Sequence, residues 1–148
     1  MAELDAKFYT YSGIDKTNKG VMTGALEDFN KSLVLKPDWA LTYFSKAIVF
    51  HNLRNLEDAF ENYTQAIKYD PKMVDAYYNR AHVVLMFENL DERGLKQALS
   101  DLRVAINLDG KFLDALYYSA VVKMKLKDYK GAVEDLDRGI EIEHHALT

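Results

Sequence analysis

The chain has 148 residues, of which 49% are hydrophobic and 28% are charged, a composition that can bury a sizeable core and argues against intrinsic disorder. The 19 basic and 23 acidic residues give a net charge of -4 without a run of five like charges, so we expect no nucleic-acid-binding surface. The absence of cysteine excludes disulfides, thiol nucleophiles and cysteine-based zinc sites.

Long segments rich in Leu, Ala, Lys and Glu are interrupted by only two prolines and seven glycines. Clean alternation of apolar and polar residues is scarce, so we expect an all-α protein. Met1 leads directly into AELDAKFYTYSG, which lacks the basic start and apolar core of a signal peptide. No apolar run approaches the roughly 18 residues that span a bilayer. We therefore expect no membrane insertion and a cytoplasmic location.

The sequence repeats itself along the chain. SLVLKPDWA and AIKYDPKMV place Pro37 and Pro71 34 residues apart, and AINLDGKFL and GIEIEHHAL continue the same frame. The step from Pro71 to Gly110 is 39 residues, five more than the period. A fixed period of this size is typical of repeat proteins. We predict one domain over residues 1–148, with repeats at about 6–39, 40–73, 74–112 and 113–146.

Small and large residues recur at helical spacing in every repeat. Each repeat opens with a large residue followed four positions later by a small one, and its second half has small, large and small residues at i, i+4 and i+7. Such spacing places these side chains on one face of a helix, where a small residue lets a second helix approach closely. The opening pairs are Tyr9 and Gly13, Tyr43 and Ala47, Tyr77 and Ala81, and Leu116 and Ala120; the later triplets are Ala25, Phe29 and Ser32; Ala59, Tyr63 and Ala66; Ala98, Leu102 and Ala105; and Ala132, Leu136 and Gly139.

At these residues the sequence resembles the tetratricopeptide repeat family, whose 34-residue unit is a pair of antiparallel helices closed by a proline. The resemblance covers about residues 6–146 and implies a right-handed α-solenoid of antiparallel helix pairs, with about eight helices in all. The chain departs from the family pattern in having no opening tryptophan. It also has five extra residues in the third repeat, and Gly110 and His144 replace the last two closing prolines.

The extra residues fall in FENLDERG, residues 87–94, and we predict an insertion near 88–92 at the turn between two helices. A surface loop, a lengthened helix end and a loop that contacts a partner all remain open for this segment. At the equivalent turns of the second and fourth repeats, Asn55 and Asp128 are predicted to be N-cap residues of the following helix.

An array of helix pairs curves and leaves an extended concave surface lined by the first helix of each repeat. The resemblance implies that the protein is an interaction scaffold holding a peptide segment of a partner protein in this groove, and that it is not an enzyme. The sequence contains no Gly-rich phosphate loop, no His-Glu-x-x-His and no nucleophile elbow, so we expect no cofactor. His51 and His82 could lie near each other, but no third ligand is evident, and we expect no metal site.

The resemblance places groove side chains one and five residues after each opening residue, and then one turn beyond. Phe44, Tyr78 and Tyr117 are the predicted anchors, although packing of these rings between repeats remains an alternative. Asn79 could pair with a peptide backbone or link two repeats, and Lys125 favours an acidic side chain of the peptide. The predicted groove residues are Thr10, Ile14, Asn18, Phe44, Ile48, His51, Tyr78, His82, Met86, Tyr117, Val121 and Lys125, flanked by Asn79 and Tyr118.

Some family members bind the C-terminal carboxylates of chaperones through a clamp of Lys and Asn in one repeat, Asn in the next, and Lys with Arg in the third. Only Asn79 matches this pattern, and two acidic residues occupy positions where cations are needed. We therefore expect no binding of peptides that end in Glu-Glu-Val-Asp. The first three repeats place Thr10, Ile14, Ser45, Asp75 and Asn79 at the clamp positions, and the last three place Phe44, Ile48, Asn79, Asp114 and Tyr118 there.

The ends of the array suggest an alternative function. A terminal repeat exposes the stripe that would pack on a neighbour, and no capping helix is evident after GIEIEHHALT. The alternatives are therefore a structural module that self-associates through its exposed repeat ends, and a fragment of a longer array.

Overall fold

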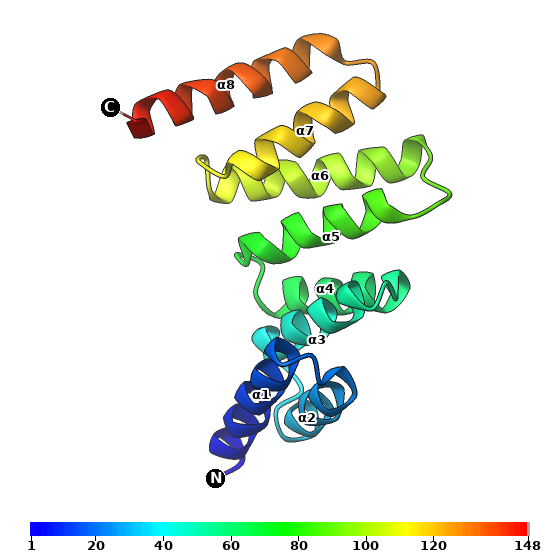
Figure 1. Ribbon diagram of the computed structural model, residues 1–148, viewed down its shortest axis with the longest axis vertical. Coiled ribbons are helices and arrows are strands. Elements are labelled where there is room, and N and C mark those ends of the chain that lie inside the picture. The colour runs from blue at the N-terminus through cyan, green and yellow to red at the C-terminus, as the bar shows by residue number, and fades with distance from the viewer. Residues whose placement is uncertain (148) are drawn as a thin grey trace. The chain divides into compact units, whose positions relative to one another are not determined.

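The computed structural model describes residues 1–147, and within them the chain forms eight helices and no strand (Figure 1). The prediction of an all-α protein is therefore confirmed. None of these helices combines the length and apolarity that crossing a bilayer requires. The helices are α1 (Ala2–Asn18), α2 (Met22–Leu35), α3 (Ala40–Asn52), α4 (Leu56–Tyr69), α5 (Val74–Met86), α6 (Glu92–Leu108), α7 (Leu113–Lys125) and α8 (Tyr129–Leu147).

The helices belong to two compact units, the first covering Met1–Ala76 and the second beginning at Tyr77 within α5. In the first unit α1 packs along α2 and α3 along α4, and α3 also packs against α1 and α2. In the second unit α7 packs along α8 and against α6. Consecutive helices that pack together across a short turn run antiparallel, so the basic element is the antiparallel helix pair.

Three of the turns within helix pairs have the same construction. They cover residues 19–21, 53–55 and 126–128, and each has one residue with a positive φ: Gly20 at 79°, Arg54 at 61° and Lys127 at 66°. The turn between α5 and α6 is longer, at residues 87–91, and none of its residues has a positive φ. Since α6 has 17 residues where α2 and α4 have 14, the extra residues of the third repeat are divided between the turn and the helix.

The contact between the helices of a pair depends on a small residue facing a large one. Gly13 of α1 is buried, and a Cβ atom at this position would come within 2.5 Å of the ring of Phe29 in α2. Phe29 is fully buried and forms a core cluster with Ala25 and with Val49 of α3. Burying a side chain of this size stabilises a fold by about 1.5–3 kcal/mol. The spacing of small and large residues in the sequence thus corresponds to direct packing between helices.

A partly buried ion pair also joins the two helices in three of the four repeats. An aspartate precedes the large residue of the second helix, and a basic residue of the first helix contacts its carboxylate. In the second repeat the equivalent residue is Asn62, whose amide donates to the carbonyl of Asp58 at 2.8 Å. The ion pairs are Lys16 with Asp28 at 2.9 Å, Arg80 with Asp101 at 2.7 Å, and Lys123 with Asp135 at 2.9 Å.

Candidate functional site

A hollow of about 240 Å³ lies between α1 and α3 in the first unit. Leu41, Phe44, Ser45 and Ile48 recur three or four residues apart, so α3 presents them on one face. Together with residues of α1 they make a lining that is apolar at its centre. We call this the α1–α3 hollow; it is lined by Ile14, Thr17, Asn18, Leu41, Phe44, Ser45 and Ile48.

Four predicted groove residues meet in this hollow: Ile14, Asn18, Phe44 and Ile48. The ring of Phe44 packs at a tilt against the fully buried Tyr63 of α4, with 5.8 Å between ring centroids. A ring supported from behind in this way loses little further freedom when a ligand binds it. Phe44 is therefore a preorganised wall of the hollow.

Thr10 does not line the hollow, and its prediction as a groove residue is wrong. The residue is fully buried, and its hydroxyl lies 2.7 Å from the Ser32 hydroxyl and 2.8 Å from the Thr42 hydroxyl. Phe44 occupies the same position of the next repeat and stays half-buried. A small hydroxyl side chain fits between helices at this position, where a phenyl ring would not.

His51 is a predicted groove residue that contacts the core of its own repeat. Its Nδ1 atom lies 3.0 Å from the hydroxyl of Tyr63, and the two rings are in edge-to-face contact. His51 lies in the first unit and His82 in the second. Within residues 1–147 no three His, Asp or Glu side chains are grouped as a metal site would require.

In the second unit the predicted anchor Tyr78 belongs to an aromatic cluster around Tyr118. The centroid of the Tyr78 ring lies 4.7 Å from that of the Phe112 ring and 6.0 Å from that of the Tyr118 ring. His82 packs edge-on against Tyr118 at 5.7 Å. Burial, followed by the charges of Asp114 and Tyr118, raises the pKa of Tyr78 to about 12, so its hydroxyl stays protonated at neutral pH. Tyr78 thus takes part in the ring packing that the sequence left as an alternative.

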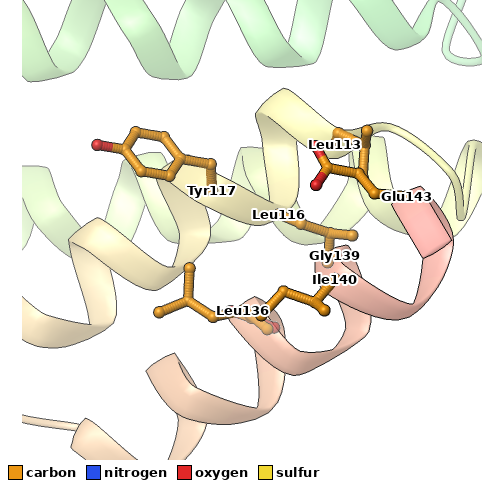
Figure 2. A pocket seen from close by; sticks show the side chains of 8 residues that line it. Leu113, Leu116, Tyr117, Leu136, Gly139, Ile140 and Glu143 are labelled. Carbon is orange, nitrogen blue, oxygen red and sulfur yellow. The ribbon is translucent and has the colours of Figure 1, made fainter.

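The other predicted residues of the second unit differ in exposure. Asn79 and Met86 on α5 and Val121 on α7 are half-buried, and Lys125 at the end of α7 is exposed. Tyr117 lies 5.5 Å from Tyr118 by ring centroid, but it also lines a separate hollow formed by α7 and α8 (Figure 2). The structure places no other predicted groove residue in that second hollow.

Sequence reasoning missed several residues of these surfaces. Leu41, Thr17 and Ser45 line the α1–α3 hollow. Tyr118, which was predicted to flank the groove, contacts the rings of Tyr78, His82 and Tyr117 and so lies at the centre of the aromatic cluster. Leu41 was detectable, because it lies three and seven residues before two predicted groove residues on the same helix. The position of Tyr118 depends on which rings of neighbouring helices reach it, and helical spacing alone does not give that.

Comparisons with known proteins agree with this architecture. A family model described as TPR repeat, where TPR stands for tetratricopeptide repeat, matches residues 55–86. The chain is 30% identical over 135 residues to the DnaJ homolog subfamily C member 7 homolog of Schizosaccharomyces pombe, an alignment that covers 80% of this chain and 27% of that protein. The chain spans between 15% and 27% of the length of the first curated relatives that it matches.

Solved structures share the fold over most of the chain. A crystal structure of MamA superposes with a TM-score of 0.87 at 17% identity, covering 97% of this chain and 81% of that one. The first TPR domain of Spaghetti (RPAP3), bound to the HSP90 peptide SRMEEVD, superposes with a TM-score of 0.77 at 15% identity, covering 84% of this chain and 95% of that one. At these identities the likeness shows the fold alone.

Proposed function

The chain belongs to the tetratricopeptide repeat family, and we propose that it is an interaction scaffold that binds a peptide segment of a partner protein on the first helices of its repeats. The observation that carries this proposal is the α1–α3 hollow, in which two first helices present apolar side chains to a common space. The fold is typical of interaction scaffolds rather than of enzymes.

The size of the hollow favours a peptide over a small-molecule ligand. Its volume of about 240 Å³ lies below the roughly 300–1,000 Å³ of pockets that enclose a small molecule. A hollow of this size suits one or two side chains of a longer ligand whose remainder lies along the surface. A peptide segment has that form.

The lining of the hollow indicates which side chain would enter it. Ile14, Phe44 and Ile48 offer apolar surface, so the anchor would be a large aliphatic or aromatic side chain. Asn18 is exposed at the rim, and its amide can both donate to and accept from a peptide backbone. In the second unit Asn79, His82, Met86, Val121 and Lys125 would form a further contact region, with Lys125 suited to an acidic side chain.

The same lining argues against a carboxylate clamp. The positions where clamp-type members have cations and amides are taken here by apolar residues such as Ile14, Phe44 and Ile48. Burying a carboxylate against such a surface without a paired cation is costly. We therefore propose that a peptide such as SRMEEVD, which the RPAP3 domain binds, does not bind this chain in the manner of a clamp.

Selection of a displayed random-peptide library on the purified chain would test the proposal. Selected peptides should share a large apolar residue, and Phe44→Ala should weaken their binding about tenfold, the loss of about 1.4 kcal/mol expected at a hot spot. Ile48→Glu should abolish binding. The matched control is Val34→Glu, because Val34 on α2 is 82% exposed and lies outside the hollow.

Two results would count against the proposal in different ways. Selected peptides that bind Ile48→Glu as tightly as the unmodified chain would show that the α1–α3 hollow is not the binding surface. Binding of SRMEEVD at roughly micromolar affinity, lost when its terminal carboxylate is amidated, would overturn the exclusion of a clamp. Circular dichroism of each variant would show that the helical fold is retained.

A further inference from the structure

A second hollow, of about 190 Å³, lies on the face of the last helix pair. Figure 2 shows side chains of α7 and α8 around it. Three of them are large apolar residues that remain exposed: Tyr117 at 57%, Leu136 at 40% and Ile140 at 64%. We call this the α7–α8 hollow; it is lined by Leu113, Leu116, Tyr117, Asp135, Leu136, Gly139, Ile140 and Glu143.

The first repeat shows what such a face of a helix pair binds. By the repeat register, Tyr117 and Leu136 correspond to Thr10 and Phe29, which are both fully buried in the first unit. They are covered by α3, whose Thr42 hydroxyl bonds Thr10 at 2.8 Å and whose Val49 packs in the core with Phe29. This face of a helix pair is therefore a seat for the first helix of another pair.

The chain itself presents a first helix with an exposed apolar stripe. Leu4, Phe8 and Tyr11 of α1 lie at i, i+4 and i+7, and they are 67%, 66% and 56% exposed. In α3 the positions equivalent to Phe8 and Tyr11 are Thr42 and Ser45, and both are buried. The stripe on α1 is thus the surface that a first helix turns toward a preceding helix pair.

We propose that the α7–α8 hollow binds α1 of a second copy of this chain, with Phe8 entering the hollow. Both surfaces expose large apolar side chains. The charge beside the stripe is mixed, because Glu3 and Asp5 flank Leu4 while Lys7 precedes Phe8, and of these three residues Lys7 is the one suited to pair with Glu143 beside the hollow. The contact is heterologous, because it joins the α1 stripe of one copy to the α7–α8 hollow of another, and each copy has both surfaces. It therefore joins copies head to tail in a growing chain instead of closing into a symmetric dimer.

This association uses residues that the peptide-binding proposal does not use, so the two proposals can fail separately. The test is the molar mass of the purified chain, measured by light scattering or sedimentation over a range of concentrations. The mass should rise beyond that of a dimer. Phe8→Glu and Ile140→Glu should each raise the concentration needed for association by at least about tenfold, whereas Val34→Glu, on an exposed residue of α2, should not.

Mixing the two variants gives the decisive measurement. Phe8→Glu keeps the α7–α8 hollow and Ile140→Glu keeps the α1 stripe, so an equimolar mixture should form a heterodimer that grows no further. A chain that stays monomeric at every concentration would overturn the proposal. So would association that both variants leave unchanged, or a mixture that remains monomeric while each variant keeps its helical circular dichroism.

Discussion

Arg80 of α5 donates two parallel hydrogen bonds to Asp101 of α6, from Nε to Oδ2 at 2.8 Å and from Nη2 to Oδ1 at 2.7 Å. The side chains are only 14% and 4% exposed. The planar guanidinium matches the carboxylate, a geometry that stabilises the pair and fixes the relative position of the two helices. Lys16 with Asp28 and Lys123 with Asp135 make the same link with a single contact.

Removing one member of the Arg80 and Asp101 pair leaves an uncompensated charge in a largely buried place. Asp101→Leu should therefore lower the free energy of unfolding by about 3–5 kcal/mol, while Arg80→Met combined with Asp101→Leu should recover most of that loss. Urea unfolding of the single and double variants measures both values. A double variant as unstable as the sum of the single ones would contradict the expected coupling between the two residues.

The ion pair of Asp28 should make the stability of the chain sensitive to acid. Burial raises the pKa of Asp28, but hydrogen bonds from Lys16 and Ser12 and the charges of Lys16 and Lys31 outweigh it and hold the pKa below its ordinary value of 3.8. The unfolded chain then binds the proton first as pH falls. The stabilisation from Asp28 is complete above the ordinary value and is lost as pH drops through the lower folded value.

Asp28→Asn should accordingly flatten the pH dependence of stability. Between about pH 5 and pH 3 the unmodified chain should lose more free energy of unfolding than the variant does, because the variant has no proton to take up at this site. Denaturant titrations at several pH values measure the difference. Parallel curves for the two proteins would show that Asp28 has the same pKa in the folded and unfolded chain.

Two predicted N-cap residues should respond differently to substitution. The Asp128 carboxylate accepts a hydrogen bond from the Gly131 amide at 3.0 Å, whereas the side chain of Asn55 makes no capping hydrogen bond to α4. Asp128→Ala should therefore cost about 1 kcal/mol, and Asn55→Ala should change stability by only a few tenths. Thermal or urea unfolding of the two variants provides the comparison, and equal losses would contradict the assigned capping.

Substitution of Thr10 should lower the stability of the fold without changing peptide affinity. Thr10→Val removes the hydroxyl that bonds Ser32 and Thr42 in the interior. Ser32 still donates to the Ala6 carbonyl at 2.9 Å, so the main loss is the hydrogen bond of the buried Thr42 hydroxyl, and leaving such a group unsatisfied costs about 1–3 kcal/mol. The same change should leave peptide affinity at the α1–α3 hollow unchanged, in contrast to Phe44→Ala. Calorimetric titration of a selected peptide against both variants tests this. A large loss of affinity with Thr10→Val would return Thr10 to the binding surface.

Much of the fold follows directly from the sequence, because the repeating small and large residues are the ones that physically meet. Gly13 is small because the Phe29 ring lies against it. Ile14 and Ile48, one residue beyond the small position of their repeats, therefore turn toward a shared space. Four of the residues that the family resemblance predicted for the groove line the α1–α3 hollow.

The errors have an equally physical cause. Helical register gives the direction of a Cα–Cβ bond but not the degree to which neighbouring helices bury the side chain. Thr10 and Phe44 therefore occupy the same position in their repeats and still differ in burial. The ion pairs escaped detection because their partners lie on facing helices. The separations are 12 residues between Lys16 and Asp28 and 21 residues between Arg80 and Asp101. The 34-residue period identifies residues that occupy the same position in different repeats, but it does not identify residues that contact each other within one repeat.

The turn between α5 and α6 has a practical consequence for modifying this chain. Arg54 and Lys127 adopt a left-handed backbone, a conformation that costs a residue other than glycine about 1–2 kcal/mol. Residues 87–91 cross between helices without it, so side-chain identity there is less restricted by the backbone, and Glu88 and Asn89 are exposed. A fluorophore or affinity tag attached at this turn would avoid the residues that line both hollows, which makes it a suitable position for labelling the protein.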